Sequence, residues 1–221
     1  AWGTSAGASG LRSIPPIQIE HRNAGCRDGA PVVEMLEKEI QEATNFYKLT
    51  LVAHFGPVKP SLEVFRSLMD SWCLIHPVAV SELSWFAFCI HLFNKDDFVR
   101  AWAQEVRCCG GCRITISRWS WECNFGRESP MAAVWIKLTG LPLPFHYPSI
   151  LAAVGDALGS FLCSDSNTDL LLDAANPRIC VEMNLLDKFP SHFLIKSPEG
   201  FQWWQRLVFH APPRFCSICD F

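Results

Sequence analysis

The spacing of apolar residues between positions 49 and 119 changes several times, and each change predicts a new element. Residues 49–55 have the composition of a strand, which Gly56 and Pro57 end. After Ser61, a residue type favoured at helix N-caps, the spacing becomes helical. The apolar positions of this helix are Leu62, Phe65, Leu68, Met69 and Trp72. The pattern therefore predicts a strand followed by an amphipathic helix.

Two more strands, a helix and a last strand follow in the same unit. Residues 78–83 and 85–93 are rich in aromatic and β-branched side chains and predict strands. Asn94 is suited to cap a second helix. Its apolar positions are Phe98, Ala101, Trp102 and Val106. The Gly110-Gly111 pair predicts a turn, and residues 113–119 alternate as a strand.

The resulting order is β-α-β-β-α-β, which is that of ferredoxin-like domains and RNA-recognition motifs. We therefore expect a four-stranded antiparallel sheet with both helices on one face. Trp72, Phe98 and Trp102 stand at helical spacing and are expected in the helix–sheet core.

A polar linker at 120–130 precedes a second, smaller α+β unit. Its expected elements are a strand at 132–138, a helix at 149–162, a strand at 178–185, and a hairpin of 192–196 with 201–210. Gly155 and Gly159 lie one turn apart on a helix face that could pack closely. The fold class is thus α+β, an RRM-like unit followed by a second α+β unit.

The predicted organisation has four parts. Residues 1–44 are a disordered or weakly helical lead-in, with a short helix expected within 31–48. Residues 45–120 form the RRM-like domain and 131–211 the second α+β unit. Residues 212–221 have the sequence of a truncated zinc knuckle.

The hydrophobic content, net charge and cysteine count of the chain limit the classes of function that it can have. Hydrophobic residues make up 49% of the 221 residues, with 9 Trp and 16 Phe, enough for sizeable cores. A net charge of −3 does not favour binding to the negatively charged backbone of a nucleic acid. Any such binding must therefore come from local basic patches. The 11 cysteines, in a chain without a visible signal peptide, predict a reducing, intracellular location, nuclear or cytoplasmic. No apolar run approaches the roughly 18 residues of a membrane span, so no membrane partner is expected.

Cys216 and Cys219 form a CxxC pair after a proline-rich segment, like the first half of a zinc knuckle. A tetrahedral site needs two more ligands, so we expect no tight zinc binding by this chain and interpret it as a fragment or degenerate copy of a longer protein. Cys109 and Cys112 are a second CxxC pair. A shared four-cysteine site is one interpretation of the two pairs, and a Gly-Gly turn with incidental cysteines is the one we favour.

Several strings of residues occur together in order. They are Trp119 before the polar linker, Ser129-Pro130, Val134-Trp135-Ile136-x-Leu138-x-Gly140-Leu141-Pro142, Gly155-x-x-x-Gly159, Asp165-x-x-Thr168, Arg178-x-Cys180-Val181-Glu182-x-x-Leu185 and Pro213-x-Phe215-Cys216-x-x-Cys219. This series resembles the plant domain of unknown function that precedes a Cys-Cys-His-Cys zinc knuckle in LINE-type retroelement and related gag-like proteins. The resemblance covers about residues 45–221. It implies a non-enzymatic, RNA- or DNA-associated packaging protein of a retrotransposon, or of a host gene derived from one, whose complete knuckle binds zinc.

Two groups of residues are candidates for contact with RNA or single-stranded DNA. Phe86 and Phe88 alternate within a predicted strand and could stack on bases, as on RNA-recognition motifs; the alternative, which we favour, is a buried sheet face. Arg113, Arg118 and Trp119 belong to a sparse basic run with interleaved tryptophans, which suits weak phosphate and stacking contacts. A solvated face with extended arginines explains that run equally well.

The sequence lacks the phosphate-binding, hydrolase and zinc-protease motifs, so we expect no enzyme. Our first hypothesis is a retrotransposon-derived nucleic-acid-binding module. The second is a protein–protein interaction or self-association scaffold, which the negative net charge and the aromatic abundance favour.

Overall fold

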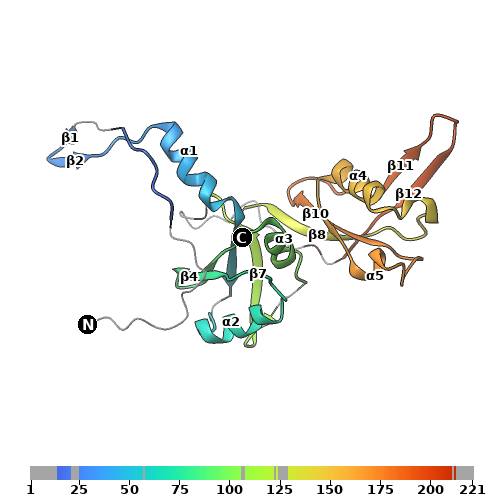
Figure 1. The fold of residues 1–221 in the computed structure, drawn as a ribbon, viewed down its shortest axis with the longest axis horizontal. Coiled ribbons are helices and arrows are strands. Elements are labelled where there is room, and N and C mark those ends of the chain that lie inside the picture. The colour runs from blue at the N-terminus through green and yellow to red at the C-terminus, as the bar shows by residue number, and fades with distance from the viewer. Residues whose placement is uncertain are drawn as a thin grey trace.

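The computed structural model describes residues 14–20, 25–56, 58–105, 108–121, 123, 129–210 and 212. Over these residues the chain is α+β, with two larger antiparallel sheets that lie side by side along the long axis of the molecule (Figure 1). Each sheet has its own hydrophobic core. We call residues 50–118 the first unit and residues 131–210 the second unit. No helix in the described ranges combines the length and the apolar character needed to cross a bilayer.

The first unit follows the predicted order of elements. They are β3 (Thr50–Phe55), α2 (Leu62–Asp70), β4 (Ala79–Ser84), β5 (Ala87–His91), α3 (Lys95–Trp102), β6 (Cys108–Cys109) and β7 (Cys112–Arg118). The sheet order is β4-β5-β3-β7-β6, and every pair is antiparallel. The prediction of four strands missed β6, a short edge strand that pairs with β7 across the Gly110-Gly111 turn. Both glycines have positive φ (55° and 79°), which explains their use in this tight hairpin.

Both helices of the first unit begin at the residues predicted to cap them. The Ser61 hydroxyl accepts a hydrogen bond from the backbone N–H of Val64 at 3.4 Å. The Asn94 side chain accepts one from the backbone N–H of Asp96 at 2.6 Å. Each hydrogen bond satisfies a backbone N–H that the first helical turn leaves without a partner. The residues at which the two helices begin therefore follow from the nearby sequence.

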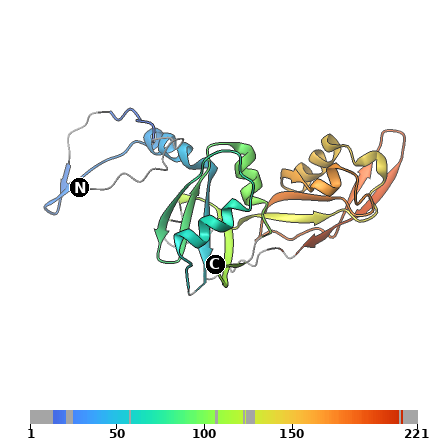
Figure 2. The same cartoon turned by 60° about the horizontal axis from the view of Figure 1, so that its bottom comes forward.

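One face of the first sheet carries the core. Leu51, Ala53 and Phe55 alternate along β3 toward this face, and side chains of both α2 and α3 pack in the same cluster. Both helices therefore cover one side of the sheet (Figure 2). The buried members contributed by the helical segments are Phe65, Met69, Trp72, Phe98, Ala101 and Trp102. The prediction that Trp72, Phe98 and Trp102 belong to this core is confirmed.

The second unit contains more strands than the sequence pattern predicted. Its elements are β8 (Met131–Lys137), α4 (Pro148–Leu158), β9 (Ser160–Ser164), α5 (Ser166–Asp169), β10 (Arg178–Asn184), β11 (His192–Lys196), β12 (Gln202–Arg206) and β13 (Val208–His210). The sheet order is β13-β8-β10-β9, and β11 and β12 form a separate two-stranded ribbon. Leu151 and Val154 of α4 are buried in the same cluster as side chains of β8 and β10.

Two predicted boundaries in this unit are wrong. The helix expected to reach residue 162 ends at Leu158, because Gly159 comes so close to β10 that a Cβ there would lie 2.3 Å from the Glu182 carbonyl oxygen. The strand expected over 201–210 is two strands: β12 pairs with β11, and after Leu207 the chain crosses to pair with β8. Gly155, within α4, also has a close neighbour, since a Cβ there would meet the Phe161 ring at 2.6 Å.

The N-terminal segment contains a hairpin that the sequence analysis did not predict. Strands β1 (Gly25–Arg27) and β2 (Ala30–Val32) pair through an Asp28-Gly29 turn in which both residues have positive φ, 52° and 79°. This is the geometry that Asp-Gly favours in two-residue hairpins. The helix expected within 31–48 is accordingly shorter, α1 (Glu37–Phe46). Residues 1–13 and 21–24 of the expected disordered lead-in lie outside the described residues.

Trp102→Ala should lower the free energy of unfolding by about 3–5 kcal/mol, because the side chain is buried between α3 and the sheet. Chemical denaturation measures the change. Trp85→Ala is the matched control: Trp85 is 74% exposed in the β4–β5 turn, and its loss should change stability by about 0.5 kcal/mol or less. Equal effects of the two substitutions would contradict the assignment of Trp102 to the core.

Candidate functional site

Phe86 and Phe88, predicted to share one sheet face, lie on opposite faces. Phe88 is fully buried in the helix–sheet core, with its ring centroid 5.1 Å from that of Phe65. Phe86 packs with the cluster on the other face, 6.3 Å from the His54 ring. The prediction fails because β5 begins only at Ala87, so Phe86 belongs to the preceding turn and the alternation does not reach it. Phe88 presents no ring face to a base, which agrees with the buried interpretation.

The sheet face opposite the helices carries a different set of aromatic side chains. Tyr47, in a 3₁₀ turn directly after α1, lies 5.1 Å from Trp119 and 5.9 Å from His91 between ring centroids. Trp121 is 53% exposed beside them. Together these four side chains line an open groove of about 360 Å³, which we call the aromatic groove. The remaining lining residues are Ala43, Thr44, Ser81, Leu83 and Cys89.

Hydrogen bonds hold His91 in the wall of the aromatic groove. Its Nδ1 lies 3.2 Å from the Thr50 hydroxyl on β3, and its Nε2 lies 3.2 Å from the Ser81 hydroxyl on β4. The Trp119 backbone N–H donates to the Thr50 carbonyl, which continues the β3–β7 ladder and fixes where Trp119 stands. The groove is thus assembled from the ends of β5 and β7 and from the segment after α1.

The described side chains that line the aromatic groove carry no formal charge at pH 7. Burial lowers the pKa of His91, and it lowers the pKa of the neighbouring His54 on β3 to about 4. Burial, reinforced by the nearby Cys123, raises the pKa of the Cys89 thiol to about 11. No Lys, Arg, Asp or Glu is among the described residues that line the groove. Its chemistry is therefore stacking and neutral hydrogen bonding.

The structure does not bring Arg113 and Arg118 to the aromatic groove. Arg118 lies on the helix side of β7, where its Nη1 donates to both carboxylate oxygens of Glu182 at 3.0 and 3.3 Å. Its guanidinium also stands over the ring of Phe98, 5.4 Å from the centroid. Arg113 is exposed but six residues from Trp119, about 20 Å along an extended strand. Of the predicted nucleic-acid residues, only Trp119 lines the groove.

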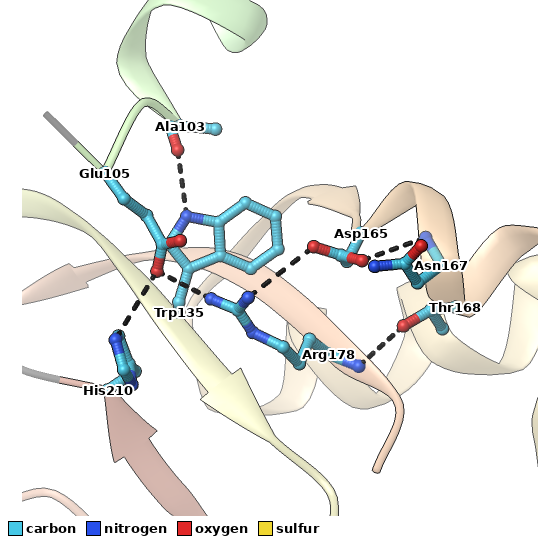
Figure 3. Close-up of polar contacts among 8 residues, drawn as sticks. All are labelled: Ala103, Glu105, Trp135, Asp165, Asn167, Thr168, Arg178 and His210. Atoms are coloured by element: carbon cyan, nitrogen blue, oxygen red, sulfur yellow. Dashed lines mark hydrogen bonds and ion pairs between the residues drawn. The ribbon is translucent and has the colours of Figure 1, made fainter. Parts of the chain in front are cut away.

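A second polar feature, which the sequence analysis missed, joins the two units around Arg178 (Figure 3). Arg178 donates to Glu105 at 2.6 Å and lies 3.6 Å from a carboxylate oxygen of Asp165. Its guanidinium stacks over Trp135 at 4.8 Å from the ring centroid, and the Trp135 indole N–H donates to the Ala103 carbonyl at 2.8 Å. A groove of about 980 Å³ lies between α3 and β9 at this junction.

Some of the residues that define the strings noted in the sequence meet at this junction. The Thr168 hydroxyl accepts from the Arg178 backbone N–H at 2.8 Å, and Asp165 caps α5 through the Asn167 N–H at 2.9 Å. Trp135, Asp165, Thr168 and Arg178 all appear together in Figure 3. Their joint occurrence in the sequence was the available signal. Because these groups bond to one another, the arrangement serves to hold the units together.

Cys216 and Cys219, the predicted half-site for zinc, lie outside the described residues. Cys109 and Cys112 face each other as a cross-strand pair in the β6–β7 hairpin. Within the part of the chain that the structure describes, no three His, Cys, Asp or Glu side chains gather as they would around a metal ion. The shared four-cysteine site therefore stays a hypothesis.

No family model matches the chain, and the searches of curated proteins and of solved structures found no match either.

Burial of His54 should make stability depend on pH. Its pKa is about 4 in the folded chain against 6.5 for an exposed histidine, so the unfolded chain binds more protons between these values. The contribution of neutral His54 to the free energy of unfolding is therefore present above pH 6.5 and is lost as the pH drops toward 4. The loss between pH 7 and pH 5 is about 2 kcal/mol. Denaturant unfolding at both pH values measures this difference. In a His54→Gln variant, the difference in unfolding free energy between pH 7 and pH 5 should be smaller by the same amount. An unchanged difference would contradict the assignment of this pH dependence to His54.

Proposed function

We propose that this protein is a non-enzymatic, nucleic-acid-binding module of the gag-like, retrotransposon-derived kind. Its ligand is single-stranded RNA or DNA, bound weakly and with little sequence preference. The first unit is, in this proposal, a ferredoxin-like domain of the RNA-recognition type. In a longer protein, Cys216 and Cys219 would begin a complete zinc knuckle that adds affinity.

The architecture of the first unit supports this proposal. The four long strands lie in the order β4-β5-β3-β7, all antiparallel, with α2 and α3 packed on one face. In sequence order this is second, third, first and fourth strand, the arrangement of a split β-α-β fold. Domains of this kind bind single strands on the face opposite the helices, through aromatic side chains.

The observation that carries the proposal is the aromatic groove on that opposite face. Tyr47, Trp119 and Trp121 offer ring surfaces beside one another, and Trp121 is more than half exposed. Stacking on aromatic rings is tolerant of sequence because every base has a π-face. The reducing, intracellular location expected from the cysteine content belongs to the same proposal.

Trp121→Ala should weaken binding of a fluorescein-labelled 12-nucleotide oligouridylate by about 5- to 150-fold, since one base–aromatic stack contributes about 1–3 kcal/mol. Fluorescence anisotropy with the full chain measures the affinity. Because the groove is uncharged, the loss should be equal at 50 and 200 mM salt.

Trp85→Ala is the control for this experiment, because Trp85 is an exposed tryptophan outside the aromatic groove. It should bind as the unchanged chain does. Absence of oligouridylate binding by the unchanged chain would overturn the proposed function. Equal affinity of the Trp121 variant would remove the groove as its site.

A specific observation favours self-association as the second candidate function. Leu170, Leu171 and Leu172 follow α5 in a turn and are 68, 58 and 71% exposed. Leu171 is also held at a φ of 56°, a conformation that is unfavourable for a residue with a side chain. Three adjacent exposed leucines are typical of a contact surface, which a second copy of this chain would bury.

Leu170→Ser/Leu172→Ser should shift the chain from dimer to monomer in sedimentation equilibrium if this surface joins two copies. Leu186→Ser, at another exposed leucine in the turn after β10, is the control and should leave the mass unchanged. A chain that is monomeric at all concentrations would reject the second candidate.

A further inference from the structure

The β11–β12 ribbon has two different faces, and its register defines them. His192 pairs with Arg206, Leu194 with Trp204 and Lys196 with Gln202, while Phe193 pairs with Gln205 and Ile195 with Trp203. Paired residues share a face, and the face alternates from one pair to the next. The ribbon stands at the end of the second unit that is farthest from the first sheet (Figures 1 and 2).

The inner face of the ribbon is anchored to the second core. Phe193 and Ile195 pack against that core. Gln205 is fully buried; its amide N–H donates to the Thr139 carbonyl at 3.0 Å and its carbonyl accepts from the Trp203 indole N–H at 3.1 Å. The inner face therefore holds the ribbon in place and leaves the outer face to present its side chains at fixed positions.

The outer face combines one large aromatic side chain with cations. Trp204 is 66% exposed, and Lys196 and Arg206 are exposed on the same face as His192 and Gln202. Neither Lys196 nor Arg206 forms an ion pair with any residue that the structure describes, whereas Arg118 and Arg178 are both paired with carboxylates. The six outer residues include no acid, and Glu199, the nearest acid along the ribbon, lies in the connecting turn.

We propose that the outer face of the β11–β12 ribbon binds single-stranded nucleic acid, with Trp204 stacked on a base and Lys196 and Arg206 in contact with phosphates. This inference rests on the proposed function and adds to it a second, charged contact site. Unpaired cations beside an exposed aromatic ring are the combination that single-strand-binding surfaces use. The ribbon thereby supplies the positive charge that the aromatic groove lacks.

The same face is a poorer match for a membrane or an apolar protein partner. Its apolar surface consists of Trp204 and the half-buried Leu194, while the other four side chains are charged or polar. Interfacial membrane binding scales with buried apolar area, and two side chains offer little of it. Separated cations around one ring suit a ligand that alternates phosphates with flat bases.

Salt dependence of binding to the labelled 12-nucleotide oligouridylate tests the charged contacts. On a single strand each neutralised phosphate contributes about 0.7 to the slope of log affinity against log salt concentration. Lys196→Gln/Arg206→Gln should therefore reduce the slope by about 1.4. The control Arg66→Gln/Lys95→Gln removes the same charge from exposed positions on α2 and α3 and should leave the slope unchanged.

Substitutions of Trp204 test the stacking contact. Trp204→Ala should weaken binding by about 5- to 150-fold, and Trp204→Phe should restore most of the affinity because a ring face remains. Circular dichroism and the melting temperature should match those of the unchanged chain, since the side chain is exposed. A structural role for Trp204 would instead lower the melting temperature.

The outcomes separate this inference from the proposed function. Binding by the unchanged chain, with Trp121→Ala weakened but all ribbon variants unaffected, would overturn the ribbon site and leave the proposed function standing. Absence of binding by the unchanged chain would overturn both. Co-sedimentation with vesicles of phosphatidylserine and phosphatidylcholine, lost in Trp204→Ala while oligouridylate binding is unaffected by the ribbon variants, would assign the ribbon to a membrane surface instead.

Discussion

Every side chain of β3 is buried, and the rest of the first unit depends on this constraint. Leu51, Ala53 and Phe55 are covered by the helices, as in any sheet with helices on one side. Thr50, Val52 and His54 point the other way and are buried as well. The second face is therefore closed at its centre, and the aromatic side chains that the structure describes on it are accessible at its margin. A ligand on this face meets the rims of the sheet, where Tyr47, Trp119 and Trp121 stand.

The Arg178 junction explains why certain residues stand together in this sequence. Arg178 bonds to Glu105 and Asp165 while stacking on Trp135, so one guanidinium connects three elements from both units. Glu182, four residues along β10, holds Arg118 of the first unit in the same manner. Ion pairs of this kind contribute little when exposed, but here several share partners and are partly shielded. Trp135, Arg178 and Glu182, three residues of the strings that suggested a family relationship, thus take part in the contacts that join the units.

Helix caps and helical spacing were predictable from the sequence, whereas strand partners and contacts between distant segments were not. The caps at Ser61 and Asn94 and the helical spacing after them depend on neighbouring residues, so the starts of both helices of the first unit were predicted correctly, and the order of its elements was correct except for the missed β6. The faces of Phe86 and Phe88 depend on the residue at which β5 begins, because the alternation of side chains within the strand does not extend to Phe86 in the preceding turn. The exchange of strand partners at Leu207 and the pairing of Arg178 with Glu105, 73 positions apart, leave no local pattern. Trp119 was named from its setting among arginines, but Tyr47 and His91, which lie in the same groove, come from segments distant in the sequence.

The distribution of charge decides what kind of nucleic-acid binding this chain can support. With a net charge of −3, the whole molecule repels a polyanion at long range, so attraction must come from a local surface. Arg118, Arg178 and Lys59 are paired with carboxylates and offer little to a phosphate. The aromatic groove is neutral, and among the outer residues of the ribbon Lys196 and Arg206 are unpaired within the described structure. Under the proposal, then, stacking supplies the salt-independent part of the affinity and the ribbon the salt-dependent part. Two phosphate contacts give a shallow salt dependence, which suits weak, sequence-tolerant binding that further charged segments of a longer protein would strengthen.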